Sequence, residues 1–157
     1  MRGISPKINS AKAPLNIDVE ESQFYFADTL WTVNESSKIK YSNTKVSSSI
    51  SLKTLSQNIA FLFDGNIKDN TIDVEVSNFE FDNLSPWLSR IKSSIDGTVN
   101  GHFNRVQKNN RQQLNSSIQT SQLIVNDYLF GALSIDVDTD SQNEIQNIEV
   151  VRKVCSI

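Results

Sequence analysis

The stretch that decides the fold of this 157-residue chain is Ile72-Asp73-Val74-Glu75-Val76-Ser77-Asn78-Phe79-Glu80-Phe81. Apolar and polar residues alternate in two runs, residues 72–76 and 79–81. Successive side chains of an extended strand point to opposite faces of a sheet. The stretch therefore predicts strands with one apolar face and one polar face.

The same alternation recurs along most of the chain. Further clear runs are residues 15–20, 95–103 and 133–138, and weaker strand candidates are residues 23–26, 31–33, 38–41, 46–52, 59–63, 114–119, 123–125 and 145–150. Segments rich in Asn, Ser and Asp predict turns at residues 34–37, 42–45, 68–70 and 126–127, and residues 108–113 predict a long exposed loop. We expect an all-β chain of about ten to twelve short strands, mostly antiparallel.

One segment breaks the alternation and predicts a short helix near residues 84–92. Ser85 can cap a helix and Pro86 suits its first position. Trp87, Leu88 and Ile91 would then share one helical face. We expect this helix to press its apolar side on the end of the sheet.

Two matching phrases carry a glycine after an aspartate, Asp64-Gly65 and Asp96-Gly97. One interpretation is a pair of hairpin turns, because Asp-Gly tolerates positive φ. The other is a repeat unit that bends its strand at glycine.

The composition of the chain limits the classes of protein to which it can belong. Apolar residues make up 38% of the chain and charged residues 21%, with a net charge of −3. This apolar fraction is lean for a compact globule and suits a thin architecture with much exposed surface. No basic patch stands out, so we expect no nucleic-acid partner. No apolar run has the length of a signal peptide or membrane span, and the single Cys155 excludes an intrachain disulfide.

The residues that could serve in catalysis, metal binding or sugar binding are explained more simply as ordinary strand residues. His102, the single histidine, lies on the polar side of its strand, and no nucleophile motif accompanies it. The run Asp136-Val137-Asp138-Thr139-Asp140 resembles the start of a calcium loop, but Ser141 stands where that loop needs glycine. The five Trp and Tyr residues show no shared spacing for a sugar-binding platform. We expect no catalytic activity, no metal and no cofactor.

Several phrases, in order, resemble the TamB-like proteins of the AsmA superfamily in Bacteroidetes-type bacteria. They are Trp31-Thr32-Val33, Ile39-Lys40-Tyr41, residues 46–52, 59–65, 76–88 and 95–101, Leu123-Ile124-Val125-Asn126 and Leu129-Phe130-Gly131-Ala132-Leu133. The resemblance covers residues 15–150, between a poorly defined extension at residues 1–14 and a tail at residues 151–157. The N-terminal membrane helix and C-terminal domain of that family have no counterpart, so the resemblance predicts an internal segment of a much longer protein or a truncated gene product.

The resemblance implies a single sheet curled into a taco-like groove with an apolar inside. It implies a periplasmic location, in a protein anchored in the inner membrane. The implied role is carriage of phospholipid chains or support of outer-membrane protein assembly and secretion, with an Omp85-type assembly protein as partner. We expect the groove to be lined by Ile72, Val74, Val76, Phe79, Phe81, Ile95, Val99, Phe103, Leu133, Ile135 and Val137. About a dozen strands would span roughly 55–60 Å.

A second architecture fits the same alternation. In a β-sandwich, two sheets close their apolar faces on each other, and the chain would be a binding or adhesion module. The two hypotheses differ in whether the apolar face is covered.

Overall fold

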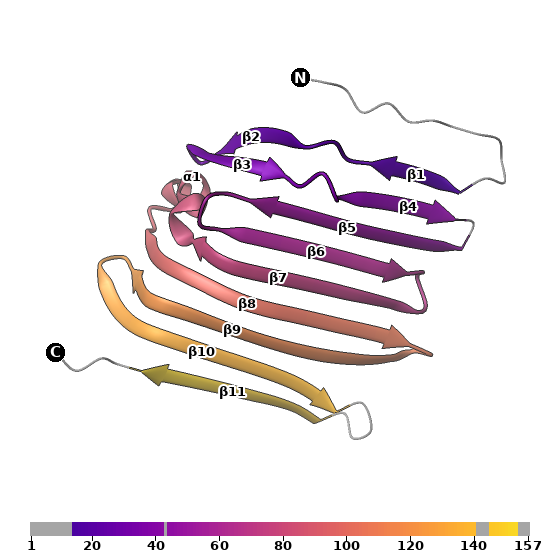
Figure 1. Cartoon of the computed structure of the whole chain (residues 1–157). Helices are drawn as coiled ribbons and strands as arrows, with labels where there is room; N and C mark the ends of the chain where they lie inside the picture. Colours follow the sequence, from indigo (N-terminus) through magenta and orange to yellow (C-terminus); the bar gives the residue numbers. More distant parts are fainter. Residues whose placement is uncertain (1–13, 43, 141–144, 154–157) are drawn as a thin grey trace.

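The computed structural model describes residues 14–42, 44–140 and 145–153. Its elements follow one another along the chain (Figure 1) with these bounds: β1 (Leu15–Asp18), β2 (Ser22–Phe26), β3 (Thr29–Val33), β4 (Lys38–Ser42), β5 (Lys45–Lys53), β6 (Asn58–Gly65), β7 (Asn70–Glu80), the 3-10 turn η1 (Phe81–Leu84), α1 (Ser85–Leu88), the 3-10 turn η2 (Ser89–Ile91), β8 (Ile95–Lys108), β9 (Arg111–Val125), β10 (Tyr128–Asp140) and β11 (Ile145–Lys153). The described chain is all-β apart from one short helical segment. The strands are not uniformly short, because β7 to β10 each have between 11 and 15 residues.

All eleven described strands belong to one antiparallel sheet, which is curled and does not close into a barrel. β4 pairs with the first half of β5 and β3 with its last two residues, so β3 and β4 together form one row. β1 and β2 form the row beyond them, and β5 to β11 follow in chain order. The result is a meander of nine rows. A second sheet is absent from the described residues, so the sandwich hypothesis is wrong for this part of the chain.

A β-bulge on β7 explains why the deciding stretch changes phase. Val76 pairs with Gly101 and Phe79 pairs with Val99, so β7 uses one residue more than β8 over the same distance. Asn78, inside the bulge, has a φ of 51°. The extra residue returns Phe79 to the face that carries Val76.

A second bulge joins two predicted strands into one. Residues 114–119 and 123–125 belong to the single strand β9, with an irregularity where Asp96 pairs with Ile124 and Thr98 with Ser121. Gln122 lies at this point with a φ of 48°. Gly97, on the opposite strand, has a φ of 118° and lies inside β8, so Asp96-Gly97 does not form the hairpin turn of the first interpretation.

Three hairpins close through two-residue turns in which both residues have positive φ. These turns are Ala27-Asp28, Asn109-Asn110 and Asn126-Asp127. Such geometry belongs to type I′ turns, whose twist matches that of the flanking strands. The long loop predicted at residues 108–113 is therefore wrong, because Lys108 and Arg111 are already paired strand residues.

The predicted helix exists between β7 and β8, at the end of the sheet (Figure 1). Leu84 occupies the N-cap position without a side-chain hydrogen bond, so the predicted cap by Ser85 is wrong. Trp87 packs on Phe26 with ring centroids 5.1 Å apart. Ile91 is 71% exposed, so this part of the predicted apolar side does not press on the sheet.

A buried pair of amide side chains ties the helical segment to the loop between β5 and β6. Asn83 donates from Nδ2 to Gln57 Oε1 at 2.8 Å and to the Glu80 carbonyl at 2.9 Å. Gln57 Oε1 also accepts the Glu80 N–H at 3.2 Å. Both amides are at most 3% exposed, and their mutual bonding satisfies groups that would otherwise be costly to bury.

We predict that Gly97→Ala lowers the free energy of unfolding by about 1–3 kcal/mol. A Cβ at Gly97 would lie 2.7 Å from the Ser121 carbonyl oxygen, in a backbone conformation that L-residues avoid. The matched control is Gly101→Ala on the same strand, whose Cβ would approach Ser117 O only to 3.3 Å. Urea unfolding followed by circular dichroism measures both variants. Equal destabilisation of the two would contradict the bulge geometry.

Candidate binding surface

One face of the described sheet is apolar in every row. Residues directly paired on neighbouring strands share a face, so the strand registers define it. We call this surface the apolar face. It comprises Leu15, Ile17, Phe24, Trp31, Val33, Ile39, Val46, Ile50, Leu52, Ile59, Phe61, Phe63, Ile72, Val74, Val76, Phe79, Ile95, Val99, Phe103, Leu114, Ile118, Leu123, Val125, Leu133, Ile135, Val137, Ile148 and Val150.

The structure brings the predicted groove residues together, with one exception. Ile72, Val74, Val76, Phe79, Ile95, Val99, Phe103, Leu133, Ile135 and Val137 all lie on the apolar face. Phe81 does not, because the chain leaves the sheet after Glu80 and Phe81 begins the 3-10 turn η1. Alternation alone does not reveal where a strand ends, and so it placed Phe81 in the strand.

The apolar face is open. Among the described residues, Trp31 is the only apolar side chain that is buried, at 2% exposure. Ile118, in the middle of the face, is 39% exposed, and Ile148 and Val150 on the last row are 62% and 59% exposed. Exposed apolar surface of this continuity marks a protein, membrane or ligand contact.

Aromatic side chains gather at the helical end of the apolar face. Trp31 lies 6.3 Å from Phe79 between ring centroids, beside the contact of Phe26 with Trp87. Trp31 Nε1 is buried without an acceptor. Sequence reasoning missed this cluster, because it depends on the strand register and on the bulge that turns Phe79 inward.

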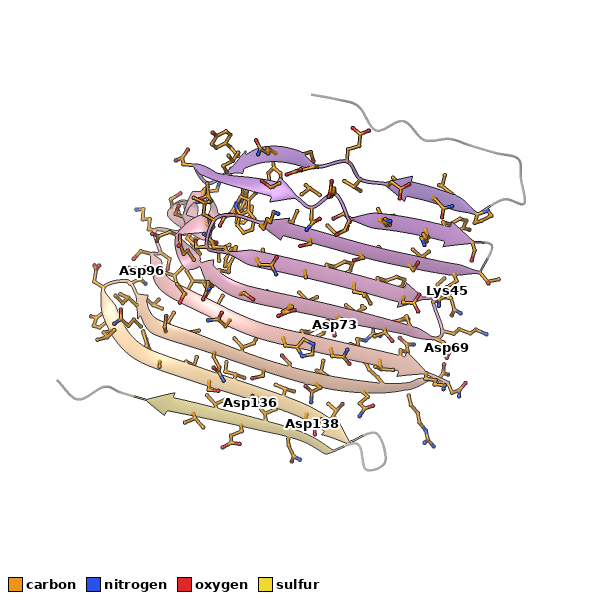
Figure 2. The ribbon with its side chains drawn as sticks, in the orientation of Figure 1. Lys45, Asp69, Asp73, Asp96, Asp136 and Asp138 are labelled. Carbon is orange, nitrogen blue, oxygen red and sulfur yellow. The ribbon has the colours of Figure 1, made fainter. Side chains whose placement is uncertain are left out.

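The opposite face is polar over most of its rows (Figure 2). It carries Lys38, Lys40, Ser47, Ser49, Ser51, Asp64, Asp73, Glu75, His102, Asn104, Asn115, Ser117, Asp136 and Asp138. Leu62 is an apolar exception, 43% exposed. The two faces together give the sheet the amphipathic character that the sequence predicts.

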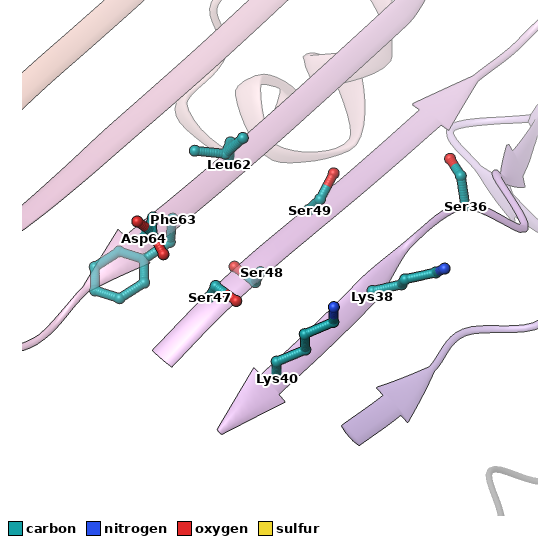
Figure 3. A pocket seen from close by; sticks show the side chains of 9 residues that line it. All are labelled: Ser36, Lys38, Lys40, Ser47, Ser48, Ser49, Leu62, Phe63 and Asp64. Carbon is teal, nitrogen blue, oxygen red and sulfur yellow. The ribbon is translucent and has the colours of Figure 1, made fainter. Parts of the chain in front are cut away.

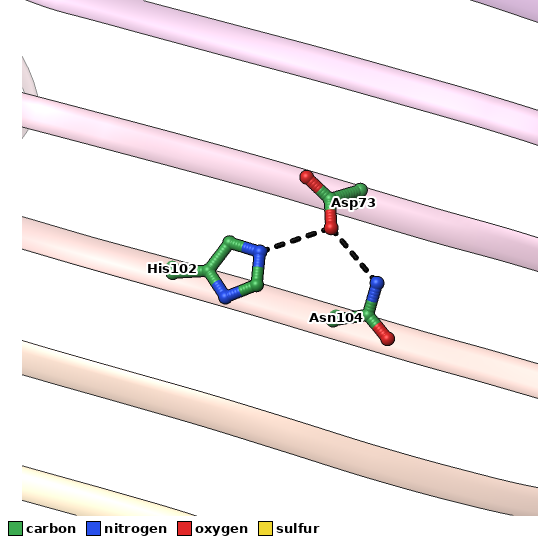
Figure 4. A network of polar contacts seen from close by, with 3 residues as sticks. All are labelled: Asp73, His102 and Asn104. Atoms are coloured by element: carbon green, nitrogen blue, oxygen red, sulfur yellow. Dashed lines mark hydrogen bonds and ion pairs between the residues drawn. The ribbon is translucent and has the colours of Figure 1, made fainter.

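His102 lies on the polar face, as predicted, and its neighbours are now visible (Figure 4). Its Nε2 lies 2.9 Å from Asp73 Oδ2, and Asn104 donates from Nδ2 to the same oxygen at 2.8 Å. The Asn104 hydrogen bond is the main cause that holds the pKa of Asp73 below its ordinary value. Partial burial acts in the opposite direction, and the hydrogen bond and charge of His102 lower the pKa further.

The aspartates of the run at residues 136–140 follow the strand. Asp136 pairs with Glu149 and Asp138 with Asn147 on β11, so both carboxylates lie on the polar face of β10. Within the described ranges, no group of three His, Cys, Asp or Glu side chains is placed to hold a metal ion. Ser141 and Cys155 lie outside the described residues.

A shallow pocket of about 270 Å³ lies over β4, β5 and β6 (Figure 3). Its lining is mainly polar-face side chains, among them Lys38, Lys40, Ser47 and Ser49. Asp64 also lines this pocket and forms an ion pair of 2.8 Å with Lys45. This pocket is small beside the apolar face, which extends over all nine rows.

No family model, no curated protein and no solved structure matches this chain. In the part of the chain that the structure describes, no helix has the length and apolar character needed to cross a membrane.

We predict that Asn104→Ala raises the pKa of Asp73 toward its ordinary value, because the variant loses the hydrogen bond that lowers it most. Asp73 has a lower pKa in the folded state than in the unfolded state. Its carboxylate therefore stabilises the fold at a pH above its unfolded-state pKa of about 3.9. This contribution is lost as the pH falls through the pKa of the folded state. Carboxyl-carbon NMR titration measures the pKa.

The matched control for this titration is Asn115→Ala. Asn115 is the cross-strand neighbour of Asn104 on the polar face and makes no hydrogen bond to Asp73. An equal shift of the Asp73 pKa in both variants would contradict the assigned cause.

Proposed function

We propose that this chain is a segment of a β-groove protein that carries phospholipid acyl chains along its apolar face in the periplasm, in the service of outer-membrane biogenesis. The observation that supports this proposal most is the apolar face itself. It is present in every row of the sheet, and in the described part of the chain no second layer covers it. The ordered phrases that resemble TamB-like proteins point in the same direction.

The energetics of acyl chains suit such a surface. Each methylene group that leaves water for an apolar contact contributes about 0.8 kcal/mol. Side chains such as Val74, Phe103 and Ile118 offer contact without directional hydrogen bonds. A chain held in this way can slide from row to row, because neighbouring rows offer equivalent contacts.

The size of the sheet suits a segment and not a complete bridge. Nine rows at a spacing of about 4.8 Å occupy about 43 Å. This length is shorter than the 55–60 Å expected from a dozen separate rows, because the described sheet has eleven strands and because β1 shares a row with β2 and β3 with β4. In the proposal, further rows continue the apolar path.

Support of outer-membrane protein assembly is the second part of the proposal. The strand β11 forms one edge of the sheet, and its outer backbone groups have no strand partner among the described residues. Such an edge can accept an extended segment of another protein by strand addition. An Omp85-type assembly protein as partner, and anchoring in the inner membrane, are proposed from the resemblance alone.

The test uses a matched pair of substitutions at similarly exposed aliphatic residues. Ile118→Glu places a charge on the apolar face, where the side chain is 39% exposed, and Leu62→Glu places one on the polar face, where it is 43% exposed. We expect Ile118→Glu to weaken binding of a fluorescent fatty acid about tenfold or more, since an unpaired charge resists desolvation by the acyl chain. Leu62→Glu should leave binding within about twofold of the wild type.

Fluorescence titration measures the affinity, and urea unfolding checks that both variants stay folded. Lipid extraction of the purified wild-type protein, followed by mass spectrometry, supplies an independent readout. The proposal would be wrong if no lipid were recovered from the purified protein and the fluorescent fatty acid did not bind. Equal loss of affinity in the two variants would also oppose it, because the probe would then not distinguish the faces.

A further inference from the structure

One charged side chain lies within the interior rows of the apolar face. Arg105 on β8 pairs with Ile72 on one side and with Leu114 on the other, and both of these are apolar-face residues. The next residue of β8 on the same face is Phe103. Arg105 is half-buried as a whole residue. A guanidinium that loses hydration at an apolar surface is destabilising unless an anion or a set of acceptors replaces the water.

The cation has no carboxylate partner among the described residues. Their two ion pairs are those of Lys45 with Asp64 and of His102 with Asp73, both on the polar face. Arg105 donates from Nη2 to Gln107 Oε1, which leaves most of its five N–H donors free. In the turn at the same end of the sheet, the Asp69 carboxylate accepts the Asn109 N–H at 2.9 Å.

Uncharged polar residues continue from Arg105 toward this end of the sheet. Gln107 pairs with Asn70 on β7 and with Gln112 on β9, so three amide side chains form a band across three rows. Asn70 Oδ1 is buried without a hydrogen-bond partner. On β7, β8 and β9 the apolar face thus ends in a polar band, and Arg105, which has no carboxylate partner, lies at the inner border of this band.

We propose that Arg105 and the adjoining amide band bind the phosphate of a phospholipid whose acyl chains lie on the apolar face. This inference rests on the proposed function and adds a head-group site to it. The guanidinium presents a planar fork of donors that matches phosphate oxygens in a bidentate manner. The side-chain N–H groups of Gln107 and Gln112 supply further donors of the same polar band.

The direction of the acyl chains of the bound phospholipid follows from the position of Arg105. From Arg105, the apolar face continues along β8 through Phe103 and Val99, over about 20 Å of strand. Toward the other end, the amide band leads directly to the turns and solvent. A phospholipid bound here has its head group at the rim and its acyl chains on the face.

A structural role for Arg105 predicts different behaviour. Arginine can lay its aliphatic stem on apolar surface and send its charge to water without binding any anion. In that case the charge would have no influence on which lipid binds. The comparison of a phospholipid with an uncharged lipid of the same chains separates the two roles.

The experiment uses dihexanoylphosphatidylglycerol and dihexanoylglycerol, which share acyl chains and differ in the phosphate head group. Calorimetric titration of the full chain compares the wild type, Arg105→Gln, Arg105→Lys and the control Arg111→Gln. Arg111 is exposed on the polar side at the same end of the neighbouring strand, so its loss changes the net charge equally. Circular dichroism and urea unfolding report on the fold.

We expect Arg105→Gln to weaken phospholipid binding about tenfold or more and to leave dihexanoylglycerol binding unchanged. Arg105→Lys should lose part of the affinity, and Arg111→Gln should behave as the wild type. Binding of dihexanoylglycerol without preference for the phospholipid would overturn the head-group site and leave the proposed function standing. Binding of inorganic phosphate with the same affinity as the phospholipid would overturn the assignment to a phospholipid, because the acyl chains would then contribute nothing. Failure of both lipids to bind the wild type would overturn both proposals.

Discussion

The pairing of neighbouring strands, which places directly opposed residues on the same face, is the constraint on which the rest of this structure depends. A shift of one residue would move a whole strand's apolar side chains into water. In this chain the alternation of apolar and polar residues changes phase after Val76 and again near Gln122. A regular strand would place the apolar residues beyond these points on the wrong face. At both points a bulge absorbs one residue and restores the phase, and residues with positive φ mark the place. The continuity of the apolar face is therefore a product of the strand register.

Much of this arrangement can be predicted from the sequence, because a period of two is a strong local signal. The all-β class, most strands, the position of the helix and the shared face of ten of the eleven predicted groove residues follow from it. The errors have physical reasons. The two-residue turn at Asn109-Asn110 was predicted as part of a longer loop, because both strands of that hairpin carry polar residues up to the turn. Phe81 kept the alternation after the strand had ended. The unpaired Arg105 was missed, because its environment is set by the register of its neighbours on β7 and β9.

The open face has a consequence for stability. In most domains of this size, apolar side chains are buried between two layers, whereas Trp31 is the one buried apolar side chain of the described residues here. The backbone hydrogen bonds of long strands and the cross-strand side-chain pairs therefore carry much of the stability.

The two ends of the sheet differ in their side chains. The Asn83–Gln57 amide contact fixes the helical segment at one end. At the other end of β7, β8 and β9, the apolar face gives way to an amide band and Arg105.

The central claim is that the apolar face is the surface that holds lipid chains. Photoaffinity labelling with a fatty acid that carries a diazirine in its acyl chain, followed by peptide mass spectrometry, tests this most directly. The account predicts labels at alternate residues of the central strands, such as Val74, Phe103, Ile118 and Ile135, and few labels at the polar-face residues between them. Labels distributed equally over both faces, or concentrated on the polar face, would contradict it.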